Sequence, residues 1–342
     1  MERERFYDFV RENIADMLPE EMTEGAEFSV QDISKTSGIY TGLVMRKPDL
    51  TITPTINLDG VYEKYQTNPE QGLDEVANMV KEHVGRIMNG GMKDIVDLAS
   101  KMSEYKNAKQ ILVVAPISEK RGIAMPDVPQ QEIEGLHFVV KMQFSADKDG
   151  VAAAVVKQSH MESWGVSKED LFNDAWENMK NLRPGKLSSM TEILSEMIGS
   201  DPVMEDILSG DMEMPMYVYT NEMRTDGAAG FFAPGVMDEI AEKLGGENYY
   251  MFPSSIHECI VVPENVLEST GLKEMKDMIE AGNATITNPA EILSETPFHF
   301  DAKEHRFEKA EDYMARAGLL EEEVVEEYEM NIPAPKMSAV MV

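Results

Sequence analysis

Three short stretches rich in β-branched residues lie close together near the start of the chain and constrain its fold more than any other feature. They are FSVQDISK, IYTGLVMR and LTITPTIN, all within residues 27–57. Runs of this length and composition, bounded by turn residues, are typical of strands. Because Ser37-Gly38 separates the first run from the second, these two predict a hairpin.

Helical patterns flank these strands. Apolar residues recur at helical spacing over residues 3–17, and the same periodicity returns at 59–67 and 70–88. The sequence therefore predicts an N-terminal α-β-β-β-α-α unit at residues 1–90, of a size suited to one small domain.

Strands and helices alternate in the rest of the chain. The apolar run at 109–117 predicts a strand buried on both faces. A strand pair follows, then a helix at 167–182 that begins at Ser167. The segment AAGFF predicts a further short strand. We expect an α+β protein in which a larger mixed α/β domain at 91–305 follows the first unit, with an acidic helical tail at 306–342, frayed at its end.

The charge of the chain is strongly negative. It has 342 residues, with 31 Lys and Arg against 63 Asp and Glu, a formal net charge of -32. Such a surface repels phosphates and anionic membranes, so direct binding to nucleic acid or membrane is not expected. The N-terminus carries no apolar signal segment and no apolar run reaches the roughly 18 residues of a membrane helix, so we expect a cytoplasmic protein.

The sulfur-containing residues indicate how the interior of the protein is packed. The 27 methionines indicate an adaptable core or interface, since Met fills irregular space. Cys259 is the only cysteine, which excludes an intramolecular disulfide. Its apolar, β-branched neighbours predict a buried, unreactive thiol.

The stretch PSSIHE combines several side chains that are common in catalytic sites. Ser254, Ser255, His257 and Glu258 are its catalytic candidates. In a strand, Glu258 would point away from His257. In a helical turn, Ser255 and Glu258 would form a capping box. We predict that PSSIHE is a structural corner between the strands YYMF and CIVVP, beside Thr220 and Asn221.

Metal and cofactor motifs are missing. His257 and Cys259 could meet His299, Asp301 or His305, but the spacing matches no known metal site. No glycine-rich loop has the spacing of a nucleotide site. We therefore expect neither a metal nor a cofactor.

Four separated segments resemble an uncharacterised family of proteins from gut Firmicutes that is known only as a domain of unknown function. They are PTINLDGVYEKYQ, SHMESWGVSKEDLFNDAWENM, MYVYTNEMRTDGAAGFF and PSSIHECIVVP, in this order, and the resemblance spans about residues 28–300. Asn57 stands where relatives tend to have Tyr. The resemblance implies a bacterial cytosolic protein, often encoded near mobile elements. Because the family has no established activity, the resemblance assigns no catalytic roles. It marks candidate binding positions at Trp164, Asn178, Thr220 and Asn221.

Three functions fit these observations. The first is a non-enzymatic binding or adaptor protein with a protein partner or a small ligand, favoured by the absence of a catalytic signature. The second is a hydrolase with His257 as base and Ser254 or Ser255 as nucleophile. The third is an acidic mimic of nucleic acid, which requires carboxylates in a line at about the phosphate spacing of DNA.

Overall fold

The computed structural model describes residues 1–35, 38–46, 55–67, 78, 81, 102–119, 125–147, 150–198, 215–284 and 289–320. The fold is α+β, as the sequence predicts, and its sheets are antiparallel. Within the described ranges no helix has the length and apolar character needed to cross a bilayer.

The N-terminal unit has the predicted order. It consists of α1 (Arg3–Met17), α2 (Glu20–Thr23), β1 (Glu27–Lys35), β2 (Gly38–Arg46), β3 (Thr55–Asn57) and α3 (Leu58–Thr67). The expected hairpin is present, since β1 pairs with β2 from Glu27↔Arg46 to Lys35↔Gly38. Most of the helix expected at 70–88, and the expected boundary near residue 90, lie outside the described residues, although residues 78 and 81 are helical.

This unit has its own apolar core. Phe6, Val10 and Ile14, one helical face of α1, pack with Leu43 and Leu58. Asp59 at the start of α3 ties the elements together: it accepts hydrogen bonds from the phenol of Tyr7 and, at 2.9 Å, from the backbone N–H of Thr41.

The larger part contains two sheets. The four-stranded sheet is built from β4 (Leu112–Ile117), β5 (Gln130–Ile133), β6 (Leu136–Asp147) and β7 (Gly150–Val155). The six-stranded sheet has the order β13-β12-β10-β11-β9-β8, from β8 (Gly185–Ser189), β9 (Tyr217–Asn221), β10 (Tyr249–Ser255), β11 (Glu258–Pro263), β12 (Phe298–Asp301) and β13 (Arg306–Lys309). Every residue of β4 is buried, as expected for the apolar run at 109–117.

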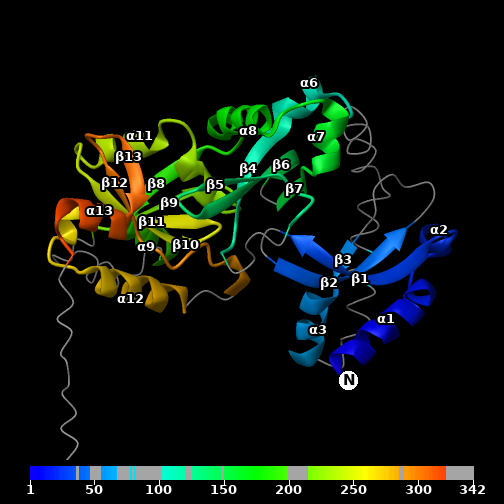
Figure 1. The fold of residues 1–342 in the computed structure, drawn as a ribbon. Coiled ribbons are helices and arrows are strands. Elements are labelled where there is room, and N and C mark those ends of the chain that lie inside the picture. Colours follow the sequence, from blue (N-terminus) through cyan, green and yellow to red (C-terminus); the bar gives the residue numbers. More distant parts are fainter. Residues whose placement is uncertain are drawn as a thin grey trace, which may run out of the picture.

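Helices cover both faces of the six-stranded sheet (Figure 1). The helices of the larger part are α6 (Tyr105–Ala108), α7 (Gln158–Trp164), α8 (Lys168–Leu182), α9 (Met190–Ile198), α11 (Val236–Lys243), α12 (Leu272–Asn283) and α13 (Ala310–Ala317), with short 3-10 turns at η2 (Lys109–Ile111), η3 (Gly227–Phe232), η4 (Glu264–Val266) and η5 (Pro289–Glu291). One apolar core unites the two sheets with α8, α11 and η3. A second lies on the opposite face of the six-stranded sheet, beneath α12 and α13.

Three sequence-based expectations need correction. AAGFF is not a strand but lies in η3, where all six residues are buried. The run is apolar throughout, so it has no alternation that could distinguish a strand from a helical turn. The short strands β5, β8, β12 and β13 were not expected. Because β13 pairs with β12, residues 306–309, which we assigned to the tail, complete the sheet.

Candidate functional site

PSSIHE is the corner between β10 and β11. Ser255 pairs with Glu258 across the turn, and Ile256 and His257 form its tip. The Ser255 hydroxyl accepts a hydrogen bond of 3.1 Å from the backbone N–H of His257. The segment is therefore neither the continuous strand nor the helical turn considered from the sequence, and Ser255 serves the backbone of the turn.

Both ring nitrogens of His257 lie close to a polar group. Its Nδ1 accepts the backbone N–H of Asp226 at 3.1 Å, and its Nε2 lies 3.6 Å from a carboxylate oxygen of Glu291. Thr220 is adjacent, as predicted, but it donates to the carbonyl of His257 at 2.8 Å rather than to the ring. The serine–imidazole hydrogen bond that a nucleophile requires is thus not among the contacts of these described residues.

Asn221 shapes the turn that follows β9. It is buried, donates to the carbonyl of Thr225 at 2.9 Å and accepts the N–H of Thr225 at 3.3 Å. At the next residue, Asp226 forms an ion pair of 2.6 Å with Lys141 of β6. This turn therefore links the two sheets and sits directly beside the His257 corner.

Trp164 and Asn178 lie away from this corner. The indole N–H of Trp164 donates to the carbonyl of Met102 at 3.0 Å, and its ring stacks on His160. Asn178 donates to the carbonyls of Lys109 and Leu112, at 2.6 Å and 3.0 Å, so it ties α8 to the start of β4. The eight candidate positions therefore do not converge, since only those at the corner and at the end of β9 come together.

The histidines considered for a metal site are also apart. Cys259 is fully buried in the core between the sheets, as predicted, and burial raises the pKa of its thiol. His299 alternates with Phe298 and Phe300, whose side chains join that core, so His299 points to the opposite face of the sheet. His305 pairs with Asp238 at 2.6 Å. Among the residues described, no group of three His, Cys, Asp or Glu side chains could hold a metal ion.

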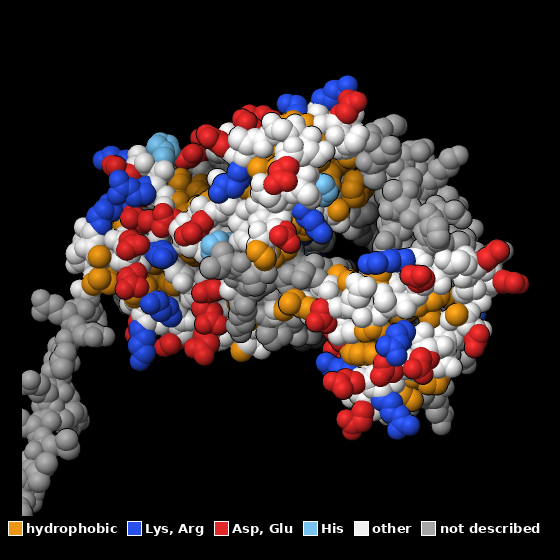
Figure 2. Space-filling view, turned by 45° about the vertical axis from the view of Figure 1, so that its right-hand side comes forward, with side chains coloured by type: hydrophobic (Ala, Val, Ile, Leu, Met, Phe, Trp, Pro, Cys, Tyr) orange, Lys and Arg blue, Asp and Glu red, His pale blue; other side chains and the backbone are white. Residues whose placement is uncertain are grey.

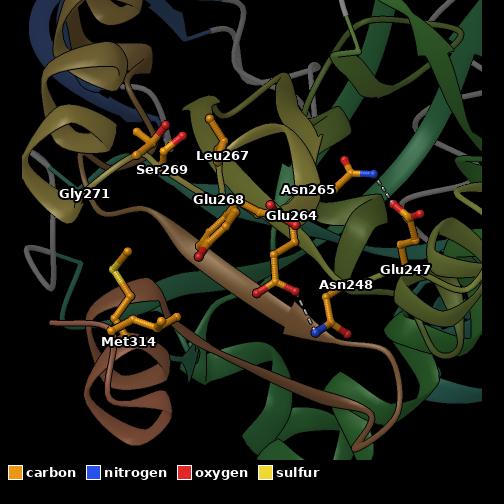
Figure 3. A pocket seen from close by; sticks show the side chains of 12 residues that line it. Glu247, Asn248, Glu264, Asn265, Leu267, Glu268, Ser269, Gly271 and Met314 are labelled. Atoms are coloured by element: carbon orange, nitrogen blue, oxygen red, sulfur yellow. Dashed lines mark hydrogen bonds between the residues drawn. The ribbon is translucent and has the colours of Figure 1, made fainter.

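A large cavity lies on the other face of the six-stranded sheet. Its volume is about 650 Å³, within the range of about 300–1,000 Å³ typical of ligand pockets. Figure 3 shows Glu264 near its centre, with Asn248 beside it and Met314 of α13 on another side. The lining, among the residues that the structure describes, is Glu247, Asn248, Tyr250, Glu264, Asn265, Leu267, Glu268, Ser269, Thr270, Gly271, Met314 and Leu319.

Glu264 is held in place by three neighbours. Asn248 donates to one carboxylate oxygen at 2.9 Å, and the phenol of Tyr313 donates to the other. His299 Nε2 lies 3.4 Å from that second oxygen. Hydrogen bonding of this kind fixes the orientation of a carboxylate, so Glu264 presents a positioned negative charge at the cavity.

His299 lies behind Glu264, and the sequence suggested it only as a possible metal ligand, not as a partner of this carboxylate. It is completely buried, and its ring stacks on Tyr313 with centroids 3.5 Å apart. Neither ring nitrogen makes a hydrogen bond of good geometry. Burial lowers the pKa of His299, while Glu264, Asp301 and Glu308 act in the opposite direction.

This burial predicts a pH dependence of stability. Because the folded chain keeps His299 neutral where the unfolded chain takes up a proton near its ordinary pKa of about 6.5, stability is expected to fall as the pH drops through that value. His299→Phe should make the free energy of unfolding fall less steeply with decreasing pH, by at most about 1.4 kcal/mol per pH unit for one proton. Urea unfolding at several pH values between 7 and 5 measures it. An unchanged slope in the variant would contradict the assignment, because the lowered pKa of His160 affects both proteins equally.

The phenols around the cavity stay neutral at physiological pH. Burial and then the nearby Glu264 raise the pKa of Tyr250 to about 12. Burial also raises the pKa of Tyr313, assisted by its hydrogen bond to Glu264. The negative charge of this site therefore resides on its glutamates.

The class of protein to which the chain belongs follows from one comparison. A model of the family of unknown function DUF5688 matches residues 3–302. The chain belongs to this family. Searches among curated proteins and among solved structures found no match.

Proposed function

We propose that this protein is a non-enzymatic binding protein that holds a small organic cation in the Glu264 cavity. The observation that carries the proposal is the charge of the lining. Glu247, Glu264 and Glu268 line the cavity, and none of the twelve described residues that line it is Lys, Arg or His. A cavity lined by charges of one sign concentrates ligands of the opposite sign.

The rest of the lining suits the organic part of such a ligand. Tyr250, Leu267, Met314 and Leu319 supply an apolar wall. Tyr250 also offers an aromatic ring, to which ammonium groups are attracted. An amine with a short hydrocarbon chain matches both the acidic and the apolar parts.

Binding is better supported than hydrolysis. Both oxygens of Glu264 accept hydrogen bonds from neighbours, so this carboxylate is positioned to bind charge. At the other candidate site the Ser255 hydroxyl contacts backbone rather than the ring of His257. The acidic mimic is less favoured, because Figure 2 shows basic side chains interspersed with acidic ones on the face it presents, not a line of carboxylates.

The test compares three six-carbon ligands that differ in charge. Protonated hexylamine, neutral hexanol and anionic hexanoate are titrated into the full chain by calorimetry. We expect saturable binding of hexylamine alone. Glu264→Gln and Glu268→Gln should each weaken it about tenfold, the effect of losing a charged contact of about 1.4 kcal/mol.

Two comparisons make this test specific. Glu268 is exposed, so Glu268→Gln is expected to fold even if Glu264→Gln disturbs Asn248 and Tyr313. Glu162 on α7 is exposed and does not line the cavity, so Glu162→Gln should bind like the parent chain. Equal binding of hexanoate, or no binding of hexylamine, would refute the proposal.

A further inference from the structure

A second, smaller cavity lies between the end of α8, the start of β8 and α11, elements that can be followed in Figure 1. Its volume is about 190 Å³. Unlike the Glu264 cavity it is lined by basic side chains: Lys180, Arg183 and Lys243. The carboxylate of Glu239 also lines it and pairs with Lys180 at 2.6 Å. Three positive charges therefore face one negative charge, in a chain whose formal net charge is -32.

Arg183 is the buried cation of this group. Only 4% of its surface is exposed. Its Nε donates to Gln143 and its Nη1 to the carbonyl of Thr225 at 3.0 Å, but Nη2 is buried without a partner. No carboxylate of the described chain forms an ion pair with it, because Asp226 pairs with Lys141. Asp226 is a negative charge that acts on Arg183, but burial outweighs it and lowers the pKa of the guanidinium, so a bound anion would stabilise the charged form.

Tyr219 adds an unused donor. It is 4% exposed and lines the cavity, yet its hydroxyl makes no hydrogen bond among the described residues. The hydroxyl lies against two other lining residues, since an added Cβ would come within 1.9 Å of it at Gly185 and 3.1 Å at Gly230. Burial raises the pKa of Tyr219, so the phenol keeps its proton and can donate it. Because the hydroxyl borders the cavity, it is available to donate to a ligand there.

We propose that this cavity binds a phosphate group, either as the free ion or as part of a small molecule. Lys180, Lys243, Arg183 and Tyr219 all line the space, and side chains with such donors suit an acceptor with several oxygens and more than one negative charge. A carboxylate, with two oxygens and a single charge, would leave donors unpaired. The site is separate from the Glu264 cavity and shares no lining residue with it.

The experiment titrates inorganic phosphate into the full chain by calorimetry at low ionic strength, with acetate in a parallel titration. We expect saturable binding of phosphate at least about tenfold tighter than that of acetate. Tyr219→Phe removes only the hydroxyl and should weaken phosphate binding about tenfold. Lys243→Ala should weaken it about threefold to tenfold.

Matched variants keep this test decisive. Lys243 is exposed, so its replacement leaves the fold intact even if Tyr219→Phe does not. Lys273 on α12 is also exposed and lines neither cavity, so Lys273→Ala should bind phosphate like the parent chain. The proposal is overturned if phosphate does not bind, if acetate binds equally well, or if Lys243→Ala and Lys273→Ala behave alike.

Discussion

Replacing Gly227 with alanine is expected to destabilise the folded chain by about 3 kcal/mol or more, at the upper end of what overpacking costs. Gly227 begins η3, where the chain passes between β9 and the β10–β11 corner. An added Cβ would lie 2.3 Å from the carbonyl oxygen of His257, 2.5 Å from the Thr220 hydroxyl and 2.9 Å from the backbone nitrogen of Asn221. Two of these neighbours are backbone atoms, so the clash cannot be relieved by rotating a side chain.

Urea unfolding of Gly227→Ala against the parent chain measures the loss. Gly282→Ala is the matched control, since it makes the same change in α12 where an added Cβ meets nothing within 4 Å. A helical Gly→Ala change should stabilise by about 0.5–1 kcal/mol. If both variants unfold at the same urea concentration as the parent, the close packing of η3 against the corner is not what holds this region together.

The elements that the sequence predicted well are those whose signals are local. The helical face of α1 is visible in the spacing of Phe6, Val10 and Ile14. Ser167 was expected to begin α8, and its hydroxyl accepts the N–H of Asp170 at 3.1 Å. Pro253 and Ser255 likewise indicated the corner after YYMF. In each case the decisive atoms lie within a few residues of one another, where propensity and capping act.

The missed strands lack such signals. Phe298–Asp301 has four residues, and Arg306–Lys309 also has four, of which three are charged. Each is stabilised by the strand beside it, since β12 lies between β10 and β13. Pairing partners far away in sequence therefore override weak local preference, as is common for strands.

The candidate site was the least predictable part. The sequence pointed to PSSIHE because its polar residues are adjacent, whereas Glu264, His299 and Tyr313 belong to three separate segments. The alternation in FHFD was the available signal: a histidine between two phenylalanines in a strand must face away from the core that they enter. What it faces depends on where α13 packs, which no local pattern specifies.

The second large expected effect is the loss of stability when the ion pair between Lys141 and Asp226 is broken. Its side chains are 13% and 10% exposed, and their charged atoms lie 2.6 Å apart. Asp226→Asn keeps a residue that tolerates the backbone φ of 52° at this position but removes the charge. It should destabilise the fold by about 3–5 kcal/mol, because Lys141 would remain buried without a partner and Arg183 would lose the same negative charge.

A second ion pair on the same protein provides the control. Lys180 and Glu239 are also 2.6 Å apart, but their side chains are 45% and 58% exposed. Glu239→Gln should cost no more than about 1 kcal/mol, since water screens an exposed pair and solvates the lysine that remains. Because the two ion pairs have the same contact distance, urea unfolding of both variants shows how much of the stability loss is due to burial. Adding Lys141→Met to Asp226→Asn should restore part of the loss, because the orphaned charge is then removed. If the two single variants lose equal stability, or if the double variant recovers none, desolvation of Lys141 is not the origin of the effect.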